Sequence, residues 1–355
     1  MTITVDCRML DASGIGVYLR GVLPCFLQSE NSFLLLGSAA QLNSFASNSN
    51  VKIIECNIKP FTIKELFFCP TEITRQINKA DVYFAPFFNI PCGIKIPVYT
   101  TIHDIIFPDM PELSSKAGLA VRMWFFRRAY KKSRKIFTVS EFSKSRIERH
   151  LGKEKPIVVT HSAVQPMFFE YRANVHNIQK KETIVFIGNI KKHKGLDYLL
   201  DAFHQARKEG LRRKLIIIGS KENFRTSDNA VLQKIEAIGA DAVSFTGFVS
   251  DENLMEHLST AALLAQPSLY EGFCLPPIEA MVLGTHALIS DIPVLKEIYA
   301  DYPVTFFRAG DSNDLKEKMM ELLFKKNAPS PVLPEQLLLK YTFEKTASVI
   351  LRELQ

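Results

Sequence analysis

A chain of 355 residues, 47% hydrophobic and 23% charged, is long enough for two domains with substantial cores, and its composition is that of a globular protein. No apolar run approaches the roughly 18 residues of a membrane-spanning helix, and the chain opens directly on an apparent strand, so neither a span nor a signal peptide is expected. The six cysteines form no CxxC pair, which favours free thiols in a reducing cytoplasm over disulfides or a zinc site.

The formal net charge of +7 is concentrated in one region. Residues 116–155 hold 13 Lys and Arg against three Glu, and residues 122–132 interleave cations with bulky aromatics. Such a segment can rest on an anionic membrane surface. It can equally be a helix whose aromatic side chains are core and whose cations face water, and the sequence leaves both interpretations open. Because no nucleic-acid-binding module is recognisable, nucleic acid is not an expected partner.

The chain begins with the pattern of a Rossmann-like β-α unit. Residues 2–6 alternate as a strand, residues 7–16 read as a loop, and residues 17–27 read as a helix. The loop contains Gly14 and Gly16 but lacks the third glycine of the dinucleotide fingerprint, which disfavours an NAD enzyme. On the residues alone, the two glycines are either part of a ligand site or an ordinary tight turn.

The rest of the predicted first domain, residues 1–168, adds further strands at 33–36, 52–56, 82–85, 98–102, 135–140 and 156–160. The fourth of these runs directly into His103, at the strand end where α/β folds place their ligands. Histidine is also common in cores, so this position is ambiguous by itself. Ser140 is predicted to cap a helix over residues 141–151. Residues 169–182 are polar and aperiodic and are interpreted as an interdomain linker.

A second β-α unit opens the predicted second domain, residues 183–340. Strand 183–187 is followed by the loop 188–195, which carries Lys191, Lys192 and Lys194, and by a helix over residues 196–207. A lysine at this position can neutralise a diphosphate as a point charge, although a solvated basic loop is the plainer alternative. The last helix, within residues 341–355, is expected to cross back to the first domain.

Residues 267–284 are the most particular stretch of the chain and read as a strand end, a tight loop and a helix. Gly272 allows a sharp turn, two prolines suit the first helical turn, and Gly284 suits the helix end. The loop amides of residues 272–275 and the helix N-terminus predict an anion site. Glu271 and Glu279 flank it as hydroxyl acceptors, the layout of a nucleotide sugar, unless they merely complement the helix dipole.

This stretch, Glu271-Gly-Phe-Cys-Leu-Pro-Pro-Ile-Glu279, resembles the E-x7-E signature of the retaining glycosyltransferases of family 4, which have the GT-B fold. The resemblance extends over essentially the whole chain. It implies an α/β protein of two Rossmann-like domains facing across a cleft. Residues 1–168 with helix 341–355 would bind the acceptor, and residues 183–340 would bind the donor.

The resemblance also implies roles for individual residues. Glu271 would approach the donor sugar, Glu279 would bind the ribose, and His103 would lie against the donor sugar. The remaining implied donor contacts are Gly14, Gly16, Asn189, Lys194, Gly272, Phe273, Cys274 and Leu275, with His103, Glu271 and Lys194 expected to serve catalysis. The sequence departs from the family pattern where Cys274 replaces a glycine, where Asn189 and His193 replace arginines, and where His161-Ser-Ala-Val164 replaces Asn-Gly-Val.

The resemblance implies retaining transfer of a sugar to a saccharide or lipid-linked acceptor in surface polysaccharide synthesis, with mannose from GDP-mannose as the expected sugar. No cofactor or metal is expected, since no Asp-x-Asp motif occurs. The expected location is cytoplasmic, with peripheral contact at the inner face of the membrane through residues 116–155. A GT-B-type sugar-nucleotide epimerase and a non-catalytic nucleotide-sugar binder are the alternatives.

Overall fold

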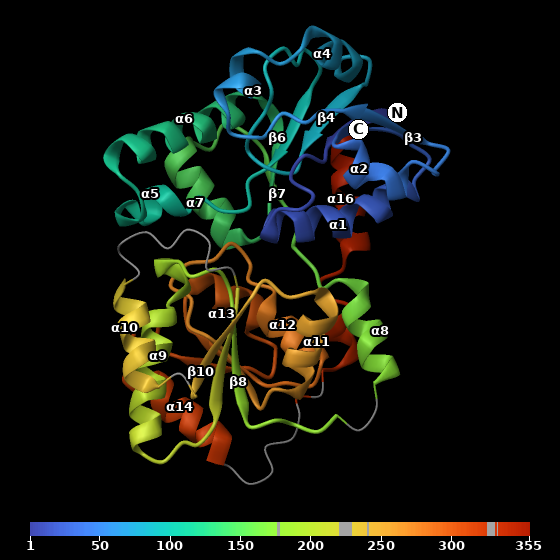
Figure 1. Cartoon of the computed structure of the whole chain (residues 1–355). Helices are drawn as coiled ribbons and strands as arrows, with labels where there is room; N and C mark the ends of the chain where they lie inside the picture. Colours follow the sequence, from blue (N-terminus) through green and yellow to red (C-terminus); the bar gives the residue numbers. More distant parts are fainter. Residues whose placement is uncertain (176–177, 220–228, 240, 325–330, 332) are drawn as a thin grey trace. The chain divides into compact units, whose positions relative to one another are not determined.

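The computed structural model describes residues 1–175, 178–219, 229–239, 241–324, 331 and 333–355. The chain forms two compact units, shown in Figure 1. Unit 1 comprises Met1–Ala163 and Tyr341–Gln355, and unit 2 comprises Val164–Lys340. Each unit contains one parallel sheet with helices packed on it, so the protein is α/β, as predicted.

The sheet of unit 1 has seven strands in the order β3-β2-β1-β4-β5-β6-β7. Its central strand β1 pairs with β2 on one side and β4 on the other, all in parallel. Strands β4 and β5 are buried along their whole length, as expected for a parallel sheet covered on both faces. The strands are β1 Thr2–Asp6, β2 Ser32–Gly37, β3 Val51–Glu55, β4 Val82–Ala85, β5 Val98–Thr101, β6 Ser133–Thr138 and β7 Ile157–Val159.

The helices of unit 1 begin where the sequence provides caps. Ser140 accepts a hydrogen bond from the Ser143 amide at 3.0 Å and starts α7, and Ser115 caps α6 in the same way. The helices are α1 Ser13–Leu27, α2 Ala39–Leu42, η1 Asn43–Phe45, α3 Ile63–Phe67, α4 Thr71–Ile77, α5 Ile106–Asp109, η2 Pro111–Leu113, α6 Lys116–Lys132, α7 Glu141–Leu151 and α16 Phe343–Leu354.

The first helix starts earlier than predicted, so the loop interpretation of Gly14 and Gly16 is wrong. Helix α1 begins at Ser13, and the Gly16 amide donates to the Ala12 carbonyl at 2.7 Å. A Cβ on residue 16 would lie 2.4 Å from the Leu10 carbonyl oxygen. Gly16 is therefore required for close packing of the helix on the preceding loop, which shortens to residues 7–12.

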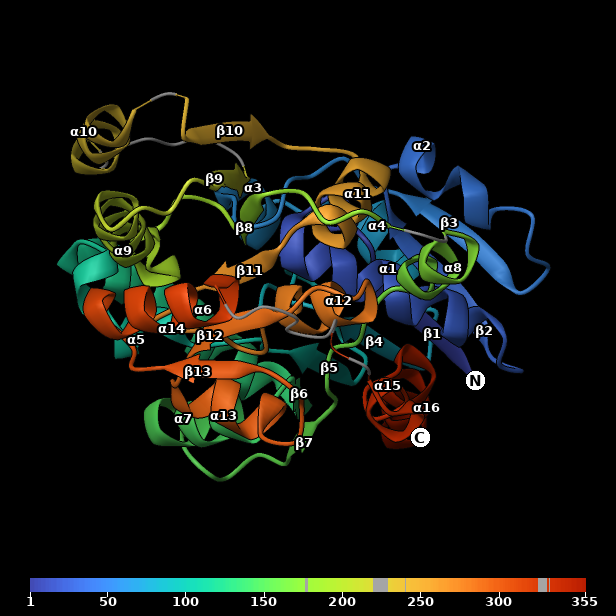
Figure 2. The same cartoon turned by 90° about the horizontal axis from the view of Figure 1, so that it is seen from below.

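The sheet of unit 2 has six parallel strands in the order β10-β9-β8-β11-β12-β13, visible from top to bottom in Figure 2. Its core is built from β8, β9 and α9, including Phe186, Leu200 and Phe203. The strands are β8 Thr183–Ile187, β9 Lys214–Ile218, β10 Val243–Gly247, β11 Leu263–Gln266, β12 Ala287–Ser290 and β13 Thr305–Phe307. The helices are α8 Pro166–Asn174, η3 Lys192–Lys194, α9 Leu196–Lys208, α10 Asn229–Ile238, α11 Asp251–Thr260, α12 Pro276–Val282, α13 Pro293–Tyr299, α14 Ser312–Phe324 and α15 Glu335–Leu338.

The division between the units lies at residues 163 and 164, five residues before the predicted domain end at residue 168. Helix α8 occupies much of the predicted linker 169–182 and belongs to unit 2, where it packs against α12. Only Phe168 of this short helix is fully buried, so its sequence carries little of the periodicity that marks a helix.

Helix α16 belongs to unit 1, although it follows unit 2 in the chain. It packs on α1, and the Thr346 hydroxyl donates to the His161 carbonyl at 2.5 Å. The His161 ring also lies 4.9 Å from the Tyr341 ring. The segment 161–164, which departs from the family pattern, thus helps to hold the C-terminal segment. No helix in the described ranges combines the length and the apolar character needed to cross a membrane.

Candidate functional site

The strongest polar contact among the predicted site residues of unit 2 is the ion pair of Lys194 and Glu271. The Lys194 ammonium lies 2.8 and 2.9 Å from the two carboxylate oxygens, and the Ser268 hydroxyl donates to one of them at 2.7 Å. Burial raises the pKa of Glu271, but the charge and hydrogen bonds of Lys194 outweigh it, and the net pKa lies below the ordinary value. Glu271 is therefore an ionised, buried carboxylate.

Backbone geometry brings these two side chains together from separate loops. Gly195 adopts a left-handed conformation (φ +69°) between η3 and α9, and a Cβ there would lie 1.9 Å from the Pro267 carbonyl oxygen. The Leu269 amide donates to the His193 carbonyl at 2.7 Å. The loops after β8 and β11 are thus fixed against each other, with Lys194 directed at Glu271.

Burial, assisted by the charge of Lys194, lowers the pKa of His193 to about 4, so its ring is neutral.

Cys274 has a left-handed backbone (φ +73°), one of two non-glycine residues with positive φ in the described ranges. This is the position at which the family pattern has a glycine, and the conformation explains that preference. The Tyr299 hydroxyl donates to the Cys274 carbonyl and helps to hold the turn. Burial, together with the neighbouring Glu271 charge, raises the pKa of the Cys274 thiol well above its ordinary value, so the thiol is inert.

The N-terminus of α12 offers fewer hydrogen-bond donors than the sequence analysis predicted. Pro276 and Pro277 have no N–H, and the amides of Ile278 and Glu279 both donate to the Leu275 carbonyl at 3.1 Å. In the described part of the chain, the amides of Cys274 and Leu275 donate to no protein acceptor. An anion here would be held by the loop before α12 rather than by the helix end itself.

Glu279 is a buried carboxyl group whose side chain makes no hydrogen bond to any described residue. Burial raises its pKa to about 8, and the nearby Asp251 charge adds to the effect. Burying an acid without a partner is costly, so such a group usually has a role beyond stability. Glu279 can accept a hydrogen bond from a ligand hydroxyl when ionised and donate one when protonated.

The other polar residues of the loop after β8 differ in exposure. Lys191 and Lys192 are exposed, and Asn189 is half-buried between β8 and η3. Within the described ranges, no three His, Cys, Asp or Glu side chains lie close enough together to hold a metal ion.

Three predicted site residues belong to unit 1. His103 follows β5, and its Nε2–H donates to the Pro86 carbonyl at 2.9 Å. That bond makes Nδ1 the acceptor nitrogen. The ring also packs edge-on against Tyr18 at 4.9 Å, and burial lowers its pKa to about 4. His103 is thus a neutral hydrogen-bonding group.

The other two predicted site residues of unit 1 lie in α1. Gly14 is exposed in the first turn of the helix, whereas Gly16 is buried.

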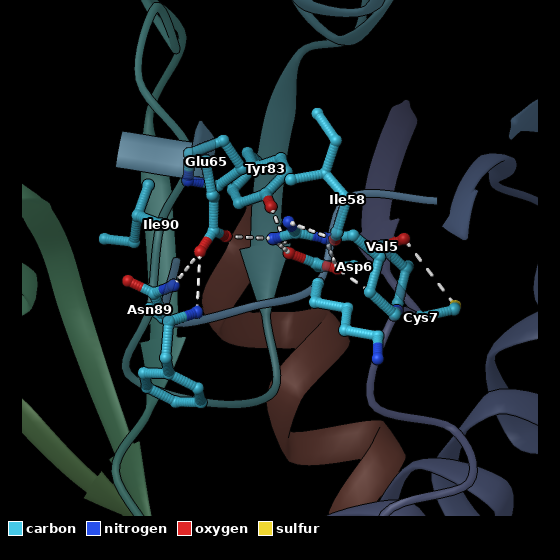
Figure 3. A network of polar contacts seen from close by, with 12 residues as sticks. Val5, Asp6, Cys7, Ile58, Glu65, Tyr83, Asn89 and Ile90 are labelled. Carbon is cyan, nitrogen blue, oxygen red and sulfur yellow. Dashed lines mark hydrogen bonds and ion pairs between the residues drawn. The ribbon is translucent and has the colours of Figure 1, made fainter. Parts of the chain in front are cut away.

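The sequence analysis missed a buried ion cluster in unit 1, shown in Figure 3. Arg8 lies 2.5 Å from Asp6 and 2.6 Å from Glu65, and all three side chains are almost completely buried. The Tyr83 hydroxyl donates to Asp6 at 2.5 Å, and Asn89 donates to Glu65. Burial raises the pKa of Glu65 although Arg8 opposes this. The cluster connects the end of β1 and the loop after it to α3. The only sign of this cluster in the sequence was an aspartate and an arginine, Asp6 and Arg8, near the end of a predicted strand.

Two family models match this chain over adjoining ranges. The glycosyltransferase family 4 model matches residues 59–167, and the glycosyl transferases group 1 model matches residues 168–331. Among curated proteins, O-antigen chain mannosyltransferase B of Escherichia coli is 27% identical over 229 residues, covering 62% of this chain and 59% of that protein. The chain thus spans about three fifths of the length of this relative.

Solved structures show the same fold. Sucrose-phosphate synthase from Thermosynechococcus elongatus matches with a TM-score of 0.75 at 15% identity, over 100% of this chain and 99% of that chain. Anabaena HepE in complex with UDP and glucose matches with a TM-score of 0.71 at 15% identity, with the same coverage. At such identities the likeness establishes the fold alone, and it confirms the predicted GT-B class of two Rossmann-like domains.

Proposed function

Because the chain belongs to the family 4 glycosyltransferases (glycosyl transferases group 1), we propose that it transfers a sugar, with retention, from a nucleotide-sugar donor to a saccharide or lipid-linked saccharide. The observation that carries this proposal is the arrangement in unit 2. The Lys194–Glu271 ion pair stands on one side of the loop 272–275, and the unpartnered acid Glu279 follows it in α12. A cation and loop amides suit a diphosphate, and flanking carboxyl groups suit hydroxyls on either side of it.

The proposed donor is GDP-mannose. The proposal is supported by the similarity to a protein named O-antigen chain mannosyltransferase B. We propose from the same similarity that the product belongs to surface polysaccharide synthesis. The proposed location is cytoplasmic, where nucleotide sugars are used, with a membrane-associated acceptor if the acceptor is lipid-linked.

In the proposed reaction, the bond between the sugar carbon and the diphosphate oxygen breaks, and an acceptor oxygen forms the new bond from the same face. The acceptor proton passes to the departing diphosphate. Lys194 and the amides of Cys274 and Leu275 would stabilise the negative charge that develops on the leaving group. We propose that these groups suffice without a metal ion. His103, Gly14 and Gly16 remain predicted contacts of the donor.

A thermal-shift panel of GDP-, UDP- and dTDP-sugars, with and without EDTA, tests the donor site directly. We expect a shift of several degrees with GDP-mannose that EDTA does not change. A larger shift with a UDP-sugar would replace the proposed donor, and loss of the shift in EDTA would contradict metal independence.

Two variants test the assignment of the carboxyl groups. Glu279→Ala should chiefly weaken donor binding, and Glu271→Ala should chiefly lower turnover. The matched control is Glu252→Ala, an exposed glutamate in the first turn of α11 of the same unit, which should change neither. Full donor binding and turnover in both site variants would contradict the assignment of this site.

A further inference from the structure

Next to the Lys194–Glu271 ion pair, three polar side chains are buried at the carboxyl ends of two neighbouring strands. Gln266 is the last residue of β11, Ser290 is the last residue of β12, and Ser268 follows β11. All three are 0% exposed. Strands β11 and β12 are paired in parallel and lie side by side in Figure 2. Because buried polar groups are costly unless they are hydrogen-bonded, their contacts indicate what they do.

These residues form a chain of hydrogen bonds that ends on Glu271. The Gln266 amide nitrogen donates to the Ser268 hydroxyl at 3.2 Å, and that hydroxyl donates to the Glu271 carboxylate at 2.7 Å. The Ser290 hydroxyl donates to the Ser268 carbonyl at 2.5 Å. Ser268 is thus held through its side chain and through its backbone, and the ends of both strands are connected to Glu271.

The direction of this chain follows from the ionisation of Glu271. An ionised carboxylate can only accept hydrogen bonds, so the single proton of the Ser268 hydroxyl is committed to Glu271. Ser268 must then accept from Gln266, and only the NH2 end of that amide can donate. The Gln266 side-chain oxygen, in contrast, has no hydrogen-bond partner among the described residues. An apolar side chain at position 266 would avoid that cost, which indicates that the NH2 group has a use.

Lys194 and Ser268 hold the Glu271 carboxylate from different loops. Lys194 contacts both carboxylate oxygens, whereas Ser268 contacts Oε1. A diphosphate bound by Lys194 would draw the ammonium away from Glu271, since a cation attracted by two anions is shared between them. The Ser268 hydroxyl carries no net charge and its proton is already committed to Glu271, so this contact would remain.

We propose that Ser268 and Gln266 are positioning residues for Glu271. The Ser268 hydroxyl, oriented by the Gln266 amide, keeps the Glu271 carboxylate in place while Lys194 turns to the diphosphate of the donor. Neither residue needs to touch the donor, because both act through Glu271. The inference rests on the proposed function, since it supports the role of Glu271 in sugar transfer.

The groups that face Glu271 determine its pH dependence. Burial raises the pKa of Glu271, whereas Lys194 and then the hydrogen bond from Ser268 lower it. Loss of the Ser268 hydroxyl should therefore raise this pKa and move the acid limb of the pH–rate profile to higher pH. His193 and the Cys274 thiol also face the carboxylate. Neither titrates near neutral pH, because burial lowers the pKa of His193 to about 4 and raises that of Cys274 well above its ordinary value.

Steady-state release of GDP from GDP-mannose, with water as the acceptor, tests the proposal in the full-length protein. Ser268→Ala should lower kcat about tenfold, the loss expected for one hydrogen bond to a charged group, with little change in the KM for the donor. Its acid limb should lie at higher pH than in the wild type. Ser268→Thr keeps the hydroxyl and should restore the wild-type limb. Gln266→Met should lower kcat about threefold in the wild type and have no further effect in the Ser268→Ala background.

Ser259→Ala is the matched control. Ser259 is also buried in unit 2, and its hydroxyl donates to the Glu256 carbonyl at 3.1 Å within α11. This change should lower stability without changing kcat or the acid limb. An equal loss of kcat in the control, a wild-type profile for Ser268→Ala, or additive effects of Gln266→Met and Ser268→Ala would overturn the proposal.

Two readouts distinguish a failure of this inference from a failure of the proposed function. A wild type that shows no thermal shift with any nucleotide sugar of the panel and releases no GDP would contradict the proposed function, and the positioning role with it. A wild type that shows both, beside a Ser268→Ala variant with unchanged kcat, would contradict the positioning role alone. Urea unfolding of Ser268→Ala, Glu271→Gln and the double variant needs no donor. We expect non-additive losses of stability, and additivity would overturn the coupling of Ser268 to Glu271.

Discussion

Lys194 and Glu271 neutralise each other in the absence of a donor, so a bound diphosphate would share the Lys194 ammonium with Glu271. Lys194→Met should raise the pKa of Glu271, because burial would no longer be offset, and should lower kcat about 100-fold to 1,000-fold. Lys194→Arg keeps the charge and should retain more activity. Steady-state transfer assays check this, and a Met variant with wild-type kcat would show that Lys194 does not assist departure of the diphosphate.

Glu279 predicts a pH dependence of stability. Its folded-state pKa of about 8 lies above the ordinary 4.5, so the folded state holds a proton that the unfolded state releases. The stability from this group is complete below about pH 4.5 and is lost as pH rises through about 8. Relative to wild type, Glu279→Gln should gain stability over that window. Urea unfolding across pH measures it, and parallel curves for the two proteins would show that the pKa is ordinary.

The buried Arg8 predicts a large effect on stability. Arg8→Met leaves the carboxylates of Asp6 and Glu65 buried without a cation, which should cost about 3–5 kcal/mol. The control Arg75→Met removes an exposed ion pair with Glu72 and should cost less than about 1 kcal/mol. Chemical denaturation compares them; similar small losses would mean that the cluster adds little to the stability of unit 1.

At the scale of single residues, the sequence identified site residues better than it predicted their contacts. The E-x7-E spacing located Glu271 and Glu279, but it did not predict that one would be paired with Lys194 and the other left without a partner. The Arg8 cluster joins segments more than 50 residues apart, and no local spacing brings Glu65 to Arg8. Such contacts depend on the tertiary fold.

At the scale of secondary structure elements, the turn between η3 and α9 positions the Lys194 loop. Gly195→Ala would combine an unfavourable φ with a clash against the Pro267 carbonyl, and it should cost about 2 kcal/mol or more and weaken donor binding. Gly210→Ala has a positive φ of +103° but nothing within 4 Å of its Cβ, so it separates backbone strain from the clash. If Gly195→Ala and Gly210→Ala lost the same amount of stability and of donor binding, Gly195 would have no special role in positioning the Lys194 loop.

Helix α7 and the strands of unit 1 were predictable, because a capping serine marks the start of the helix and short apolar runs mark the strands. The failures concern short or atypical elements. The glycines at positions 14 and 16 suggested a loop, yet both lie in α1. Gly16 packs there against the Leu10 carbonyl, whereas a Cβ on Gly14 would meet nothing within 4 Å. Helix α8 buries too little to show a pattern. At α12, two prolines signalled the helix start correctly but also removed donors that the predicted anion site had included.

At the scale of the whole molecule, the contact between α1 and α16 joins residues that are far apart in the sequence. A Cβ on Gly21 would lie 2.3 Å from the buried Phe343 ring, so Gly21→Val should destabilise unit 1 by about 1–3 kcal/mol. Phe343→Leu should cost less on its own and should partly rescue Gly21→Val. Urea unfolding of both single variants and the double variant checks this, and simple additivity would show that the two sites do not interact.

The position of α16 at the far end of the chain also affects the order in which the two units become complete. Unit 2 is continuous in the chain, whereas unit 1 is divided between residues 1–163 and 341–355. During translation, residues 1–163 and all of unit 2 leave the ribosome before α16, so α1 lacks the helix that packs on it until α16 has been made. Until then, the surface of α1 around Gly21 stays uncovered on the nascent chain, and apolar surface exposed in this way favours aggregation during folding.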